Sequence, residues 1–162
     1  MKNSKLVFDI EADDLYDGVS QVWCIVTKCV DTLEVNRFRP DEIPEALSFL
    51  SSAKLLIGHN IIDYDLPVLE KLYGFTYNQG VIDTLVYSRL LNPDRLHGHS
   101  LRAWGIRLGC LKLDFGKDED TKIDAFKEYT EEMLVYCEQD VEVNYQLLLE
   151  LDRQAKELEN ES

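Results

Sequence analysis

The stretch Leu6-Val7-Phe8-Asp9-Ile10-Glu11 is an apolar, β-favouring run that ends in two carboxylates spaced by two positions. The pattern predicts a β-strand, and because side chains alternate between its faces, Asp9 and Glu11 project from the same face, about 7 Å apart at Cα. Two anions held this close repel each other, and a cation bound between them would remove the repulsion. Ligands of open α/β sheets gather at the carboxyl ends of strands, which is where this pair falls. A polar rim on an edge strand is the alternative interpretation, since Asp-x-Glu alone is a weak motif.

The length and composition of the chain are typical of one soluble globular domain. It has 162 residues, of which 45% are hydrophobic and 30% are charged. We therefore expect a single domain over residues 1–162, with fraying from about residue 156. There is no apolar run long enough for a membrane span and no signal peptide, so we expect a cytoplasmic protein without a membrane partner. The cysteines lack zinc-site spacing and are expected to be reduced, small hydrophobic residues: Cys24, Cys29, Cys110 and Cys137.

The charge of the chain is strongly acidic but unevenly distributed. A net charge of −14 argues against a protein that holds nucleic acid over its whole surface. It does not exclude an enzyme that touches a few nucleotides through bound metal ions. From Arg89 to Lys112, five basic residues accompany one acid, Asp94. This basic segment is equally consistent with a solvated stretch and with a track for phosphates, to which Arg102 and Arg107 would contribute.

The hydrophobic pattern predicts three leading strands, followed by strands that alternate with helices. Expected strands cover residues 6–11, 21–30, 33–38, 54–57 and 81–82. Helix signals are N-terminal caps at Asp41, Asp63, Asp83, Ser100 and Thr130, and stops at Gly74 and near Gly109. Residues 114–127 are charged and loop-like. This order predicts an α/β fold with a mixed sheet.

Three further polar residues are candidates for the same sheet edge. Asp65 follows the strand that ends in Gly58-His59-Asn60, although it could simply be a helix-start residue favoured by the macrodipole. Tyr136 and Asp140 are spaced by four, which puts them on one helix face within about 6 Å at Cβ. On its own, that pair could equally be part of the core.

Read together, three segments resemble the exonuclease motifs of the DnaQ-like 3′→5′ exonucleases of the DEDD superfamily. They are Phe8-Asp9-Ile10-Glu11, Asn60-x-x-x-Tyr64-Asp65 and Tyr136-x-x-x-Asp140. One branch of the superfamily has a histidine five residues before the last aspartate, where this chain has Val135. The tyrosine four residues before it resembles the other branch, which includes proofreading domains and RNase D.

Residues 83–90 and 100–109 are most similar to the exonuclease domain of phage family A DNA polymerases, and the resemblance runs from Leu6 to about Leu149. Two departures are that no polymerase domain follows, and that the connection from Asn92 to His99 is short. The resemblance implies an RNase H-like mixed five-stranded sheet flanked by helices.

It also implies a two-metal 3′→5′ exonuclease that releases nucleoside monophosphates from DNA, preferably single-stranded. The expected cofactors are two divalent cations, Mg²⁺ or Mn²⁺, which suit carboxylate ligands. By resemblance Asp9 bridges both ions, Glu11 and Asp140 complete the first, Asp65 serves the second, and Tyr136 orients the attacking water.

The remaining expectations concern substrate, partner and setting. By resemblance Asn60 and the backbone of Ile10 and Ala12 lie near the 3′-terminal nucleotide. We expect a stand-alone, proofreading-like enzyme of phage or bacterial DNA replication or repair, which could work with a separate DNA polymerase or replication protein. The alternatives are an RNA-trimming exoribonuclease of the RNase D type and a catalytically idle nucleic-acid-binding subunit. The idle subunit is disfavoured because all four acids are present.

Overall fold

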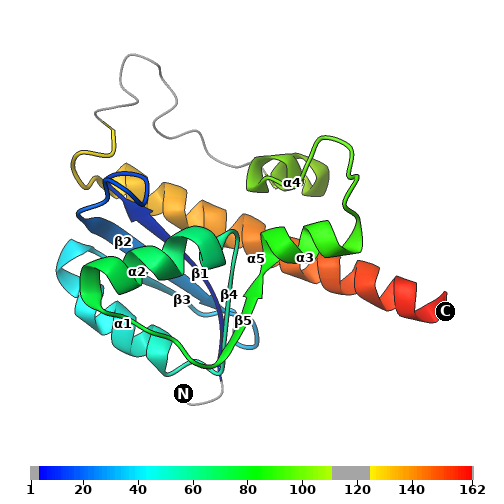
Figure 1. Ribbon diagram of the computed structural model, residues 1–162, viewed down its shortest axis with the longest axis horizontal. Helices are drawn as coiled ribbons and strands as arrows, with labels where there is room; N and C mark the ends of the chain where they lie inside the picture. Colours follow the sequence, from blue (N-terminus) through cyan, green and yellow to red (C-terminus); the bar gives the residue numbers. More distant parts are fainter. Residues whose placement is uncertain (1–3, 111–124, 162) are drawn as a thin grey trace.

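A five-stranded mixed sheet with strand order β3-β2-β1-β4-β5 forms the centre of the protein (Figure 1). The computed structural model describes residues 4–110 and 125–161. Strand β1 pairs antiparallel with β2 and parallel with β4, so it lies in the middle of the sheet. The predicted α/β fold with a mixed five-stranded sheet is confirmed. The strands are β1 (Lys5–Ala12), β2 (Val22–Cys29), β3 (Val35–Phe38), β4 (Leu55–Gly58) and β5 (Gly80–Asp83).

Helices cover both faces of this sheet, and β1 alternates between the two cores. Leu6, Phe8 and Ile10 pack with residues of α1 and α2 on one face. Val7 packs on the other face with α5, the face toward which Asp9 and Glu11 also project. The helices are α1 (Ile43–Ser51), α2 (Leu66–Tyr73), α3 (Thr84–Leu91), α4 (Leu101–Leu108) and α5 (Glu131–Asn160).

The later helices form a satellite core beyond β5. Trp104 of α4 is buried against Leu147 and Leu151 in the second half of α5. Figure 1 shows α4 and α3 lying beside this part of α5, away from α1 and α2. The first half of α5 is therefore the part that faces β1.

Most helix ends predicted from capping residues are confirmed. The side chains of Asp83, Ser100 and Thr130 accept backbone N–H groups in the first turns of α3, α4 and α5. Gly74 and Gly109 end α2 and α4 in left-handed conformations, with φ of 66° and 70°.

Three predicted boundaries are wrong. Helix α1 is preceded by a 3₁₀ turn, η1 (Pro40–Glu42), which contains Asp41, so that Glu42 takes the N-cap position. Asp63 is exposed within a five-residue π-helical turn, η2 (Ile61–Asp65), whose N-cap is Asn60. Leu33 has a φ of 66° and lies in the turn after β2, which delays the start of β3 to Val35.

The expectations for the C-terminal part of the chain stand as follows. Helix α5 continues to Asn160, and fraying from about residue 156 stays a prediction. Lys112 and most of the charged segment 114–127 lie outside the described residues. None of the helices described in 4–110 and 125–161 combines the length and apolar composition needed to cross a membrane.

Candidate active site

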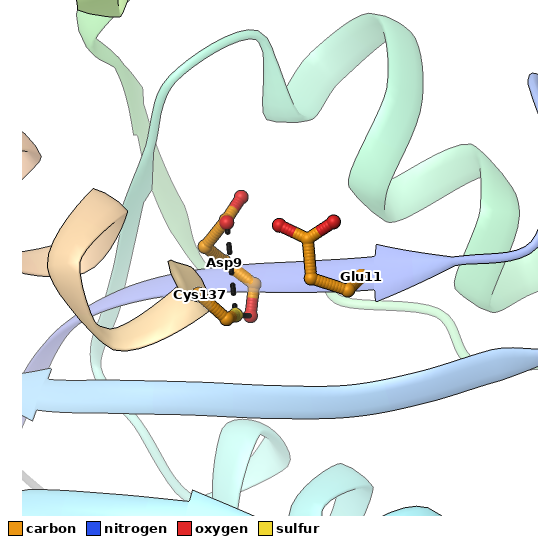
Figure 2. Close-up of side chains that lie close together, drawn as sticks. All are labelled: Asp9, Glu11 and Cys137. Carbon is orange, nitrogen blue, oxygen red and sulfur yellow. Dashed lines mark hydrogen bonds between the residues drawn. The ribbon is translucent and has the colours of Figure 1, made fainter. Parts of the chain in front are cut away.

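Asp9 and Glu11 lie close to the Cys137 thiol of α5, on the face of β1 that α5 covers (Figure 2). One ligand atom from each of Asp9, Glu11 and Cys137 lies within 4.8 Å of the others. The Cys137 thiol donates to the backbone oxygen of Asp9 at 3.4 Å and to its Oδ2 at 3.7 Å. The two carboxylates expected to share one face of the strand do so, and a third potential metal ligand accompanies them.

The contact between Cys137 and Asp9 was not predicted from the sequence. We expected a small hydrophobic residue, and the side chain is indeed fully buried in the core between α5 and the sheet. Burial is the largest cause that raises the pKa of its thiol, followed by a hydrogen bond with Cys24 and the nearby charge of Asp9. The available signal was spacing, since Cys137 precedes Asp140 by three residues and therefore shares its helix face.

Asp65 joins the same site from the turn that precedes α2. Its carboxylate is buried, and its Oδ2 accepts the backbone N–H of Ile10 at 3.3 Å. Burial raises the pKa of Asp65 well above its ordinary value, and the charge of Asp9 raises it further, while the Ile10 hydrogen bond acts in the opposite direction. Metal-free, this pair of carboxylates is electrostatically unfavourable, and a divalent cation would relieve the repulsion.

Asp83 holds the turn that carries Asp65. Its Oδ1 accepts the backbone N–H groups of Asn60 and Leu85, each at 2.9 Å, and its Oδ2 accepts that of Ile62 at 3.1 Å. Asn60 adopts a left-handed conformation with φ of 62° at the start of η2. The sequence predicted Asp83 as the cap of α3 and gave no sign of its second role in holding η2.

Tyr136 and Asp140 lie on the first half of α5. Asp140 is buried at 6% exposure, and Tyr136 is half-buried one turn earlier. Because Asp140 shares a helix face with Cys137, which contacts Asp9, this face of α5 is turned toward β1. The structure thus brings Asp9, Glu11 and Asp65 together and directs the Asp140 face of α5 toward them.

Three ion pairs fix the position of α5 across β2 and β3. Arg37 binds Glu138 in a bidentate pair, and Arg39 and Lys28 bind other glutamates of the helix, Glu131 and Glu142. The pairs made by Arg37 and Arg39 are exposed to solvent and add little stability, whereas the side chain of Lys28 is largely buried. Their positions alternate with Cys137 and Asp140 along the helix, so their main effect is to set the register that presents those two residues to β1.

A cavity of about 540 Å³ opens beside Glu11. Ile10 and Ala12, predicted near the terminal nucleotide, line it together with Leu15, Tyr64 and Phe126. The Tyr64 hydroxyl donates to the backbone oxygen of Asp14 at 2.6 Å, which fixes its ring in the wall. Burial and the charge of Asp65 raise the pKa of Tyr64, so the phenol stays neutral.

Two backbone N–H groups of this region are taken up by hydrogen bonds within the fold. The N–H of Ile10 is directed at Asp65 and that of Asn60 at Asp83. These two residues therefore position the acids, and their predicted contact with substrate stays a prediction.

The arginines of the basic segment are largely engaged in the satellite core. Arg95 and Arg107 lie over the ring of Trp104, at 4.7 and 4.8 Å from its centroid. Arg107 donates to the backbone oxygens of Leu96 and of Gly98, the latter at 2.7 Å. Arg102 is exposed and lines a hollow of about 450 Å³ on α4 together with Arg107.

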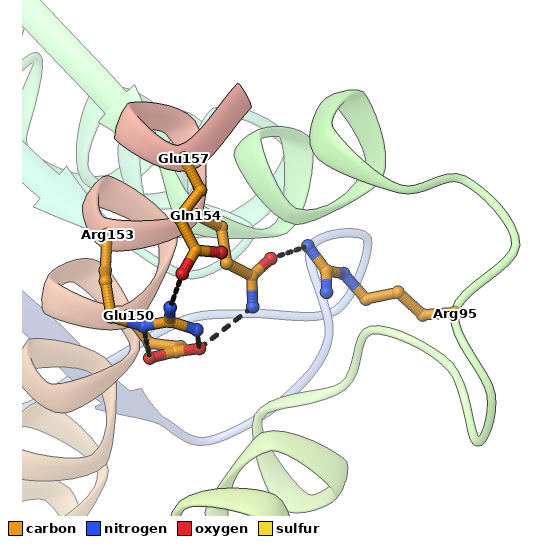
Figure 3. Close-up of polar contacts among 5 residues, drawn as sticks. All are labelled: Arg95, Glu150, Arg153, Gln154 and Glu157. Atoms are coloured by element: carbon orange, nitrogen blue, oxygen red, sulfur yellow. Dashed lines mark hydrogen bonds and ion pairs between the residues drawn. The ribbon is translucent and has the colours of Figure 1, made fainter. Parts of the chain in front are cut away.

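Arg95 reaches α5 through a polar network (Figure 3). It donates to Gln154 at 2.8 Å, Gln154 donates to Glu150 at 3.0 Å, and Glu150 pairs with Arg153. These contacts give Arg95 a structural role between the α3–α4 connection and the C-terminal part of α5.

Comparison with known proteins gives relatives among phage polymerases. The DNA-directed DNA polymerase of Escherichia phage T7 is 30% identical over 90% of this chain, as is that of Enterobacteria phage T3. The chain spans 26% of the length of each polymerase. No protein-family model matches the chain.

Solved structures with the same fold include several nucleases. NrnC of Brucella melitensis matches 97% of this chain and 75% of its own, with a TM-score of 0.67 and 16% identity. A structure described as the apo form of a nuclease has a TM-score of 0.67 at 20% identity over 93% of this chain and 72% of its own. Escherichia coli RNase D, an exoribonuclease, matches 99% of this chain and 40% of its own, with a TM-score of 0.61 and 18% identity. The polymerase relatives support the resemblance to DnaQ-like exonucleases, and these structures confirm the predicted fold.

Proposed function

We propose that this chain, a DnaQ-like exonuclease by fold and by its polymerase relatives, is a metal-dependent hydrolase. It would remove nucleoside monophosphates from the 3′ end of DNA. The observation that supports this most directly is the acidic cluster, which we define as Asp9, Glu11, Asp65 and Asp140. Its members come from β1, η2 and α5, and Asp65 is buried despite the charge of Asp9. Such an arrangement is unfavourable without cations and suits them well.

The donor set fits hard divalent cations, because carboxylate oxygens are the ligands that Mg²⁺ and Mn²⁺ prefer. Two such ions, when bound, activate a water and neutralise charge at the scissile phosphate. We assign Asp9 to both ions, Glu11 and Asp140 to the first, and Asp65 to the second. A Mg²⁺-bound form of NrnC is known, which supports divalent-cation binding by a protein of this fold.

Tyr136 would position the attacking water. A tyrosine hydroxyl ordinarily stays protonated at neutral pH, so it orients by hydrogen bonding and is a poor general base. Tyr136 lies on α5 one turn before Asp140, so the two residues share a helix face. A hydroxyl in this role would orient a water without adding a negative charge.

The cavity beside Glu11 would take the terminal nucleoside. Leu15, Tyr64 and Phe126 offer apolar and aromatic surface for a base and sugar, and stacking on such surface depends little on sequence. A cavity of this size accepts one frayed strand more readily than a duplex, which supports a preference for single-stranded ends.

DNA is the proposed substrate because the polymerase relatives at 30% identity act on DNA by name. RNA is the second candidate, favoured by the match to RNase D. NrnC has also been captured with pGG, a short nucleic acid. We further propose that the chain forms a single domain acting in the cytoplasm on replicating or repaired DNA, with a separate polymerase as its partner.

The test is digestion of end-labelled single-stranded DNA and RNA of one sequence, side by side, with Mg²⁺ and with EDTA. We expect mononucleotide release from free 3′-OH ends of DNA, arrest by EDTA, and protection by a blocked 3′ end. Asp65→Asn should be inactive, whereas Asp63→Asn, on the exposed side of the same turn, should match the wild type. Cuts within circular single-stranded DNA would contradict the proposal, and faster digestion of RNA would favour the second candidate.

A further inference from the structure

A chain of hydrogen bonds joins the end of β4 to α5 through the first residue of α3. The Thr84 hydroxyl donates to Oδ1 of Asn144 at 2.7 Å, and Nδ1 of His59 lies 3.0 Å from the same hydroxyl oxygen. A hydroxyl has one proton to donate, so Thr84 accepts the Nδ1–H of His59 while it donates to Asn144. Thr84 and Asn144 are both buried, so water does not compete for their bond.

The two ends of this chain lie on elements that carry members of the acidic cluster. His59 directly follows β4 and precedes η2 by one residue, and Asp65 is the last residue of η2. Asn144 follows Asp140 by four residues on α5, so these two side chains share a helix face. Neither His59 nor Asn144 is among the proposed metal ligands. The chain would therefore act on bound ions only through the elements that it joins.

Asp83, the residue before Thr84, holds the other side of the same corner. Its carboxylate accepts the backbone N–H groups of Asn60 and Ile62, in the turn that carries Asp65. Asp83 ends β5 and Thr84 begins α3, which lies beside α5 (Figure 1). Two adjacent residues thus hold η2 through a carboxylate and α5 through a hydroxyl.

We propose that Thr84 and Asn144 are positioning residues, which set the distance between η2 and α5 and hence between the carboxylates of Asp65 and Asp140. This proposal rests on the proposed function, because it concerns the same acidic cluster. The exposed ion pair of Glu138 with Arg37 holds α5 from β3, on roughly the opposite helix face from Asp140. The Thr84–Asn144 bond is the stricter constraint, because breaking a buried hydrogen bond leaves polar atoms without partners.

The test measures Mn²⁺ binding by titration calorimetry on the chelator-treated full chain, without substrate. Thr84→Val keeps the shape of the side chain and removes its hydroxyl. We expect about 10-fold weaker Mn²⁺ binding, the lower end of the loss usual for residues that support metal ligands. Thr84→Ser returns the hydroxyl and should return the affinity. A role in stability alone would lower Tm and leave the Mn²⁺ Kd of the folded protein unchanged.

Thr27→Val is the matched control. Thr27 is also fully buried, in β2, but its hydroxyl oxygen has no hydrogen-bond partner among the described residues. The same exchange there removes a hydroxyl without breaking a bond. Its Mn²⁺ Kd should therefore equal that of the wild type, and its Tm should not fall.

Asn144→Leu tests whether the two residues act through one bond, and it replaces Thr84→Val should that variant fail to fold. It removes the acceptor and should weaken Mn²⁺ binding to a similar extent. The double variant should lose no more affinity than the weaker-binding single variant, because either change already breaks the bond. Losses that add in the double variant would overturn the proposal.

The wild type separates failure of this inference from failure of the proposed function. If the wild type binds Mn²⁺ and a folded Thr84→Val binds it equally well, the positioning role is overturned while the carboxylate site stands. A wild type that binds no Mn²⁺ would overturn the carboxylate site itself, and this inference with it.

Discussion

In the acidic cluster at the end of β1, Asp65 is buried and is repelled by the charge of Asp9. Its carboxylate accepts a hydrogen bond from a backbone N–H. Arg95 and Arg107, beside Trp104, are also charged. Their guanidinium groups donate hydrogen bonds to backbone oxygens and to Gln154, and they lie over the Trp104 ring. The carboxylates thus face burial and mutual repulsion, whereas the guanidinium groups, which also repel each other, have acceptors in contact.

This difference separates the two predictions made from charge. Carboxylates that the fold crowds together indicate a ligand that neutralises them, because such crowding persists only where another constraint maintains it. Guanidinium groups that contact carbonyl oxygens and a ring stabilise their own surroundings. The acids are therefore the stronger indication of chemistry, and the basic segment is mainly a structural clamp from which Arg102 projects.

The largest expected effect is the loss of Asp9. Asp9→Ala removes the proposed bridging ligand and should abolish measurable nuclease activity. Tyr136→Phe removes one hydroxyl contact and should lower kcat by about 10- to 1000-fold, as for other single positioning contacts. Single-turnover rates on 3′-labelled DNA measure both. Equal loss of activity in the two variants would refute the positioning role of Tyr136.

Bound divalent cations should reduce the repulsion among the carboxylates of the acidic cluster and so stabilise the protein. A cation at 100 times its Kd adds about 2.7 kcal/mol of stability if the unfolded chain does not bind it. For a domain near this size that corresponds to a Tm rise of about 5–10 °C, measurable by calorimetry after chelator treatment. A Tm indifferent to millimolar Mn²⁺ and Mg²⁺ would mean that the acids do not form one site.

The same tension should appear as a pH dependence in the metal-free protein. Because the pKa of Asp65 is raised in the folded chain, the folded state binds more protons than the unfolded state between the two pKa values. The stability that Asp65 contributes is full below its unfolded pKa and is lost as pH rises through its folded pKa. The free energy of unfolding of the wild type, minus that of Asp65→Asn, should therefore fall as pH rises. A rise of this quantity with pH would contradict the prediction.

The fold was predictable wherever local signals agree with the final structure. Alternation along β1 placed Asp9 and Glu11, and the caps at Ser100 and Thr130 fixed two helix starts, because these depend on residues close in sequence. The helix start predicted at Asp63 was wrong because this turn donates backbone hydrogen bonds to Asp83, which lies twenty residues later. No local pattern predicts a π-helical turn held by a distant carboxylate.

Spacing and resemblance predict the acids of the candidate site, but they do not predict the surroundings of those acids. The catalytic roles of Asp65 and Asp140 stay predictions that mutagenesis can test. The approach of Cys137 to Asp9 and the engagement of Arg107 with the backbone depend on how α5 and α4 pack. Such packing is a property of the assembled layers, so a single sequence does not specify it.

A smaller effect is expected at Asp83, which supports the acidic cluster without belonging to it. Asp83→Asn leaves one oxygen and puts an amide against a backbone N–H, so one buried donor loses its acceptor. We expect a loss of about 1–3 kcal/mol, and hence a Tm about 2–12 °C lower, together with a weaker response to Mn²⁺ because η2 carries Asp65. Asp63→Asn, exposed in the same turn, should stay within about 0.5 kcal/mol of the wild type. An unchanged Tm in Asp83→Asn would refute its support of η2.

The smallest expected effect tests the arginines. With three or four phosphates contacted on a single strand, log K should fall with log salt at a slope of about −2 to −3. Arg102→Ala should flatten the slope by about 0.7, the value for one phosphate on a single strand. Arg107→Ala should instead lower Tm and leave the slope unchanged, because its guanidinium is bound to Leu96 and Gly98. The reverse pattern would show that Arg107 faces substrate, and the contrast between strained acids and satisfied arginines would then fail on its basic side.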